Sequence, residues 1–168
     1  MENANVVKSV TAAVVGFVSG IGAYLSGKLG VLFYVLVILA AMMVVDYITG
    51  MLASKKEAIE HPEDTGYGWS SKKGTIGIIK KVGYLCVIAV AVAFDYIILY
   101  ALADTGIKID IKAFFGILVT IWFVLNEMLS IAENAGRMGA PIPAWLTKYI
   151  AVLKNKIEAK GDIKEGDD

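Results

Sequence analysis

Three acidic residues lie inside long apolar stretches of this chain. They are Asp46 in residues 29–53, Asp95 in residues 82–103 and Glu127 in residues 111–132. A stretch of about 20 apolar residues is long enough to cross the hydrocarbon core of a bilayer. An ionisable side chain costs ~2.5–3.5 kcal/mol at the centre of such a segment, so these groups are expected to join helices or to line a polar path.

Two interpretations of the acids remain open, and a proton or ion relay in a transporter is a third. In the first, Asp46, Asp95, Glu127 and the neighbouring Asn126 face water in an oligomeric pore. In the second, they hydrogen-bond neighbouring helices and hold a bundle together. No lysine or arginine lies in the membrane core of these stretches, so no cation is expected to pair with them. Helix rise places Asp46 and Glu127 at one depth and Asp95 nearer the other face.

The composition excludes several classes of protein. Of 168 residues, 57% are hydrophobic, whereas soluble domains are ~45–50% apolar. The formal net charge of +0 gives no indication of a nucleic-acid partner. One cysteine and one histidine predict neither a disulfide nor a metal centre. No nucleophile–base pair or nucleotide-binding motif is evident, so we expect neither an enzyme nor a cofactor.

The apolar segments predict an all-α integral membrane bundle of three or four transmembrane helices. The expected helices are residues 6–27, 29–53, 82–103 and 111–132. The first is the least apolar, and a helix lying on the membrane surface is its alternative. Its small residues recur at spacings of three and four, which places them on one helical face and favours close helix packing. They include Gly16, Gly20, Ala23 and Gly27.

Residues 54–81 are expected to form a polar loop that is rich in lysine. The ammonium groups of these lysines would reach the phosphates of the membrane surface. The six residues are Lys55, Lys56, Lys72, Lys73, Lys80 and Lys81.

The C-terminal region is expected to form a second unit, residues 136–168, after a transmembrane domain of residues 1–135. Leu146, Ile150, Leu153 and Ile157 recur at helical spacing, which predicts an amphipathic helix followed by a disordered tail. The positive-inside rule places this region and the 54–81 loop in the cytoplasm, because both are rich in cationic residues.

Three stretches of the sequence, residues 44–50, 70–81 and 126–143, together resemble a known family. They are similar to the phage holin family that includes the holin-like protein of clostridial toxin secretion. The resemblance covers roughly residues 30–157. The family's motif positions fall here on Asp46, Thr49, Gly50, Lys72, Lys73, Gly74, Lys81, Asp95, Glu127, Ser130, Glu133 and Asn134.

The resemblance implies a multi-pass protein of the bacterial cytoplasmic membrane, with its C-terminus in the cytoplasm. Such proteins form homo-oligomers in the lipid bilayer and open pores, which release a phage endolysin during host lysis or a large toxin during secretion. The alternatives are a selective ion channel or transporter and a non-conducting antiholin-type regulator.

Overall fold

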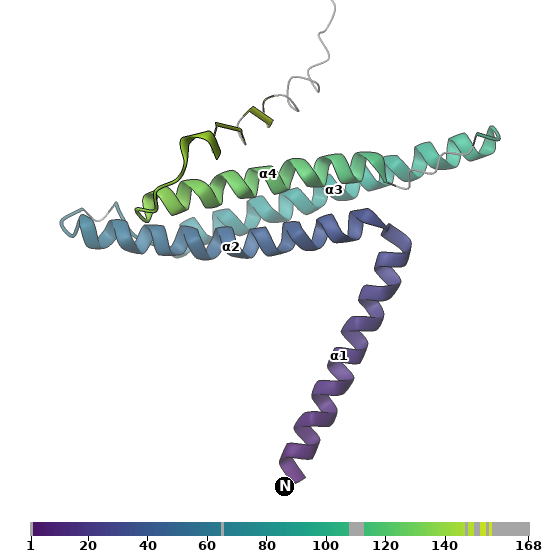
Figure 1. Cartoon of the computed structure of the whole chain (residues 1–168), viewed down its shortest axis with the longest axis horizontal. Coiled ribbons are helices and arrows are strands. Elements are labelled where there is room, and N and C mark those ends of the chain that lie inside the picture. Colours follow the sequence, from purple (N-terminus) through teal and green to yellow (C-terminus); the bar gives the residue numbers. More distant parts are fainter. Residues whose placement is uncertain are drawn as a thin grey trace, which may run out of the picture.

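The computed structural model describes residues 2–64, 66–107, 113–146, 148–149, 152–153 and 155. Four long helices make up most of this part of the chain (Figure 1). They are α1 (Glu2–Leu29), α2 (Val31–Glu60), α3 (Ser71–Asp104) and α4 (Phe114–Arg137). All four are long and apolar enough to cross a membrane. The predicted all-α membrane class is confirmed.

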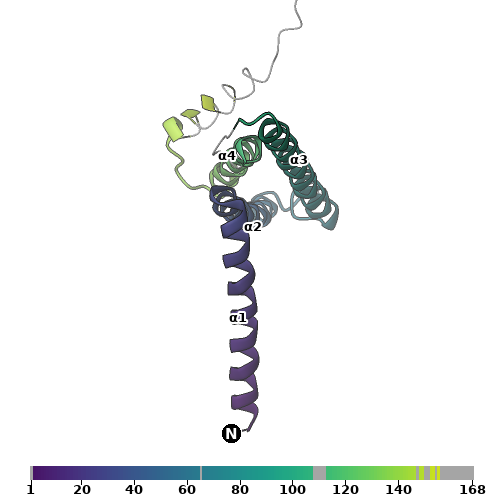
Figure 2. The ribbon, with the colours of Figure 1, turned by 90° about the vertical axis from the view of Figure 1, so that its right-hand side faces the viewer.

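Helices α2, α3 and α4 run side by side and form a bundle. Helix α4 packs closely on α2 and also contacts α3, whereas α2 and α3 barely touch each other. The view along the bundle shows the same arrangement, with α2 and α3 both next to α4 (Figure 2). Residues from all three helices form the core: Leu39, Tyr84, Ile88 and Phe123. The rings of Tyr84 and Phe123 are stacked, with centroids 4.0 Å apart.

Helix α1 leaves the bundle at Gly30 and contacts only α2 among the four helices. Gly30 has a φ of +57°, in the left-handed region that favours glycine. This residue turns the chain so that α1 points away from the other helices (Figure 1). The apolar side chains of α1, such as Phe17 and Val18, are exposed as a result.

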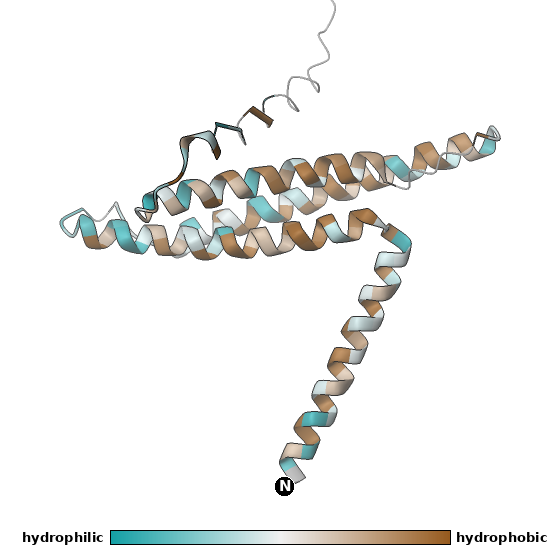
Figure 3. Cartoon of the chain, viewed as in Figure 1, coloured by the Kyte–Doolittle hydropathy of each residue, from teal (hydrophilic) through white to brown (hydrophobic). Residues whose placement is uncertain are grey.

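Two of the expected boundaries are wrong, because the polar loop is shorter than residues 54–81. Helix α2 continues to Glu60 and α3 begins at Ser71, which leaves only residues 61–70 between them. The Ser70 side chain caps α3 by accepting a hydrogen bond from the Lys73 amide at 3.2 Å. The lysine-rich segments are therefore helical extensions of α2 and α3, which Figure 3 shows as more hydrophilic ends of apolar helices.

Helix α4 ends at Arg137, and Gly139, with a φ of +90°, precedes two prolines. Residues 144–146 are helical. Parts of the expected amphipathic helix, including Ile150 and Ile157, and the whole of the expected tail lie outside the described residues.

Candidate functional site

A buried ionic cluster joins the three bundled helices. The Lys81 ammonium group on α3 lies 2.9 Å from the Asp46 carboxylate on α2 and also donates a hydrogen bond to Glu127 on α4. The side chains are 14%, 17% and 4% exposed, respectively. One cation thus contacts a carboxylate on each of the other two helices. In an apolar environment this pairing offsets much of the cost of burying the charges.

The cluster corrects one expectation and confirms another. A cation is available to the acids after all, because α3 begins well before residue 82 and carries Lys81 into the bundle. Asp46 and Glu127 share one depth, as helix rise predicted, since the same ammonium group contacts both.

Asn134 of α4 extends the cluster toward the end of the bundle. Its amide nitrogen donates to Asp46 Oδ1 at 3.1 Å and to Thr49 Oγ1 at 3.3 Å. Its amide oxygen accepts a hydrogen bond from Arg137 at 3.0 Å. Both oxygens of Asp46 are therefore engaged, one by Lys81 and one by Asn134. The only sequence signal for Asn134 was its place in the family motif.

Arg137 forms a bidentate ion pair with Glu57 at the same end of the bundle. Its Nε and Nη2 atoms each lie 2.7 Å from a Glu57 carboxylate oxygen. This pair joins the last turns of α2 and α4. Sequence reasoning missed it, because 80 residues separate the partners and neither lies in an apolar stretch.

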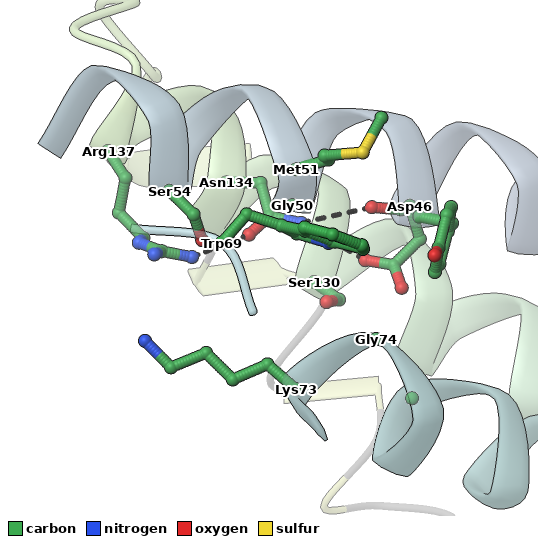
Figure 4. A pocket seen from close by; sticks show the side chains of 12 residues that line it. Asp46, Gly50, Met51, Ser54, Trp69, Lys73, Gly74, Ser130, Asn134 and Arg137 are labelled. Carbon is green, nitrogen blue, oxygen red and sulfur yellow. Dashed lines mark hydrogen bonds between the residues drawn. The ribbon is translucent and has the colours of Figure 1, made fainter. Parts of the chain in front are cut away.

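A cavity of about 320 Å³ lies beside the cluster, between α2, α3 and α4. Figure 4 shows Asp46 at one end and the charged groups of Lys73 and Arg137 at the other. All three motif stretches contribute to its walls. Its lining residues are Asp46, Tyr47, Gly50, Met51, Ser54, Trp69, Lys73, Gly74, Gly77, Ser130, Asn134 and Arg137.

Glycine is needed at one wall of this cavity. A Cβ atom on Gly74 would lie 3.1 Å from the Tyr47 hydroxyl and 3.2 Å from the Trp69 ring. Both distances are shorter than ordinary van der Waals contact, so any side chain here would push Tyr47 or Trp69 aside.

Asp95 lies apart from the cluster and caps the start of α4. Its carboxylate accepts hydrogen bonds from the amides of Phe115 at 2.9 Å and Gly116 at 2.7 Å. The residue is 5% exposed. Asp95 thus connects α3 to α4, because it supplies acceptors for amides at the start of α4 that have no partner within that helix. Asn126 is half-buried and makes no hydrogen bond to the described residues of either acidic site.

The predicted packing face of α1 is open within the described chain. No atom lies within 4 Å of a Cβ built on Gly16, Gly20 or Gly27, and Ala23 is exposed. Any partner for this face is therefore outside the described part of the molecule. The packing role of these residues stays a prediction.

The six lysines predicted to lie at the membrane surface have different surroundings in the structure. Lys55, Lys72 and Lys80 are exposed, and Lys56 pairs with Glu60 on its own helix. Lys73 is exposed but bonds the carbonyls of Gly66 and Gly68. Lys81, predicted to lie at the membrane surface with the others, is instead turned into the bundle. Among the residues that the structure describes, no group of His, Cys, Asp and Glu could hold a metal ion.

Comparison with known proteins identifies the family. The model of the bacteriophage holin family matches residues 20–155. An uncharacterized protein of Halalkalibacterium halodurans is 35% identical over 70% of this chain and 76% of its own length. Uncharacterized proteins of Listeria innocua and Listeria monocytogenes are each 34% identical over 92% of this chain, and over 91% and 88% of their own lengths. No solved structure matches the chain.

The family match spans the three bundled helices and every residue of the ionic cluster. Four apolar helices make the chain a multi-pass membrane protein. This protein is a member of the bacteriophage holin family.

Proposed function

We propose that this protein is a holin, which oligomerises in the bacterial cytoplasmic membrane and opens pores. These pores would release an endolysin during host lysis or a large toxin during secretion. The family match over residues 20–155 is the observation that carries the proposal. Four membrane-length helices with a buried charge cluster are consistent with it.

A pore for proteins requires several copies of the chain. The centre of the bundle is filled by side chains such as Leu39, Tyr84 and Phe123, so a single copy has no room for a folded cargo. Helix α1 offers a surface for contact between copies, because its Gly16–Gly20 face is open and small residues allow helices to approach closely.

The ionic cluster would have two roles in this proposal. Before assembly, Lys81 bridges the two carboxylates inside the bundle, and the outer faces of the helices toward lipid are mostly apolar. After assembly, the same groups would face water at the wall of the pore, where their charges are hydrated. Asp95 and Asn126 are the further candidates for polar positions at the wall.

The proposed orientation follows the positive-inside rule. The lysine-rich ends of α2 and α3, the 61–70 loop and the C-terminal region would lie in the cytoplasm. Residues 136–168 would then form a cytoplasmic unit beside the membrane domain of residues 1–135.

Expression in a bacterium that contains a cytoplasmic endolysin tests the proposal. Induction of the wild-type chain is expected to cause sudden lysis. An Asp46→Asn/Lys81→Met/Glu127→Gln variant, present in the membrane in the same amount, is expected to change the time at which lysis begins. Loss of ions without lysis would favour a channel. No leak, together with delayed lysis by a second holin, would favour an antiholin-type regulator.

A further inference from the structure

The cavity beside Asp46 has two cationic side chains, Lys73 and Arg137, at its entrance. Glu57 neutralises Arg137 through two hydrogen bonds. Lys73 forms no direct ion pair with a carboxylate of the described residues, although its charge also acts on Glu57. Its ammonium group donates to the carbonyls of Gly66 and Gly68, at 3.3 and 3.2 Å. Figure 4 shows Lys73 and Arg137 on opposite sides of this entrance.

Uncharged donors line the same cavity. Within the described residues, the side-chain hydroxyls of Ser54, Ser130 and Tyr47 make no hydrogen bond to another residue, although all three line the space. Hydroxyls and cations are the groups that bind phosphate oxygens.

The hydropathy of its helices predicts that the cavity lies near the level of the lipid headgroups. It opens at the end of the bundle where α2 and α3 pass from apolar to lysine-rich sequence. Trp69 forms one wall and is 44% exposed. Tryptophan is enriched at this depth, where its ring is among acyl chains and its N–H is among headgroups. Basic pockets between transmembrane helices are known sites for anionic lipid headgroups.

The inner end of the cavity limits the charge of its ligand. Asp46 and Glu127 share the single ammonium group of Lys81, so the cluster holds one carboxylate more than it holds cations. This excess negative charge repels a ligand with two negative charges that reaches the inner end of the cavity. A phosphodiester carries one negative charge, and in a phospholipid its acyl chains remain outside the cavity, against the apolar surface of the helices.

We propose that this cavity binds the phosphodiester headgroup of an anionic phospholipid, such as phosphatidylglycerol. The lipid belongs to the leaflet at the 61–70 end of the bundle. Lys73 and Arg137 contact the phosphate, and Ser54 and Ser130 donate to the phosphate or to the polar headgroup. Lipid binding at this site is independent of the proposed pore, because it needs only the folded bundle in a membrane.

Native mass spectrometry of the full chain in detergent tests the site directly. The protein is mixed with equal amounts of phosphatidylglycerol and phosphatidylcholine, whose masses differ. We expect one molecule of phosphatidylglycerol to bind in preference to phosphatidylcholine. Lys73→Gln should weaken that binding about fivefold, the effect expected for one cation beside an anionic headgroup.

Two further variants separate the cavity from general charge attraction. Gly77→Leu fills the space without changing any charge, and no atom lies within 4 Å of a Cβ at this position, so the fold should tolerate it. It should abolish the preferred binding. Lys28→Gln removes an exposed cation in the last turn of α1, far along the chain from the cavity, and should leave the binding unchanged.

Three outcomes would overturn the proposal. The first is equal binding of the two lipids. The second is unchanged phosphatidylglycerol binding in both Lys73→Gln and Gly77→Leu, each shown to be folded by circular dichroism. The third is displacement of the lipid by inorganic phosphate at equal concentration, which would assign the cavity to a soluble anion. None of these readouts depends on pore opening, so the site and the holin function can fail separately.

Discussion

The ammonium group of Lys81 lies 2.9 Å from the carboxylate of Asp46 and joins α3 to α2 across 35 residues of sequence. The same group bonds Glu127 on α4, so one cation connects all three bundled helices. Elsewhere the backbones of α2 and α3 approach at few points, and their contacts are made by side chains such as Tyr47 against Gly74. The packing of α3 in the bundle therefore depends on α4 and on this cluster.

Replacing Lys81 with methionine should destabilise the bundle strongly. The substitution keeps a similar side-chain length but leaves two buried carboxylates without a cation. Removing one partner of a buried ion pair costs ~3–5 kcal/mol. The free energy of unfolding in mixed detergent micelles, followed by circular dichroism, would measure this loss.

Two variants control that measurement. Lys72→Met removes an exposed lysine and should change the free energy of unfolding by less than ~0.5 kcal/mol. Adding Asp46→Asn and Glu127→Gln to Lys81→Met removes the stranded charges and should recover most of the stability. A Lys81→Met protein as stable as wild type would show that the cluster does not hold the bundle.

Replacing Asp95 with alanine should weaken the start of α4. The amides of Phe115 and Gly116 would lose their acceptor in a buried place, at a cost of about 2 kcal/mol. Asp95→Asn keeps one acceptor oxygen and should cost less. Amide hydrogen exchange at residues 115 and 116 would reveal the loss. Asp104→Asn, an exposed acid on the same helix, should leave that exchange unaltered, and equally slow exchange in Asp95→Ala would refute the capping role.

Gly116 should not tolerate a side chain. A Cβ atom there would lie 2.8 Å from Val92 Cγ2 and 3.3 Å from an Asp95 oxygen, so Gly116→Ala must displace the Val92 side chain or shift α3. Overpacking of this kind costs ~1–3 kcal/mol. Gly83→Ala meets no atom within 4 Å and should be neutral or slightly stabilising. Thermal unfolding of the two variants in the same detergent compares them, and equal stability would contradict the close contact.

The Arg137–Glu57 pair should show coupling that depends on salt. Single substitutions Arg137→Gln and Glu57→Gln each remove the ion pair and at least one of its two hydrogen bonds, so the double variant should lose less stability than the sum of the single losses. Added salt should reduce this coupling, because the pair is partly exposed. Additive losses at low salt would mean that the two residues do not interact in the membrane-bound protein.

The sequence predicted the helices and the depth of the acids, because hydropathy and helix rise are properties of single segments. It did not predict the role of Lys81. Successive residues of a helix point about 100° apart, so Lys80 faces outward while Lys81 faces the bundle. Which of two adjacent lysines turns inward depends on the neighbouring helices, and hydropathy along one segment does not contain that information.

The direction of α1 and the pairs at the end of the bundle could not be predicted for similar reasons. The direction of α1 depends on the backbone angles of one residue, Gly30. The contact of Asn134 with Asp46 joins residues 88 positions apart, and it forms only because α2 packs against α4. The resemblance marked both residues as motif positions, but the structure was needed to show that they touch.

Release of size-graded fluorescent dextrans from vesicles tests the central claim most directly. The purified wild-type chain is predicted to release protein-sized dextrans once its density in the membrane passes a threshold. The Asp46→Asn/Lys81→Met/Glu127→Gln variant should incorporate equally and show a different threshold. A wild-type protein that inserts and oligomerises but retains every dextran, at all densities, would contradict the assignment as a pore-forming holin.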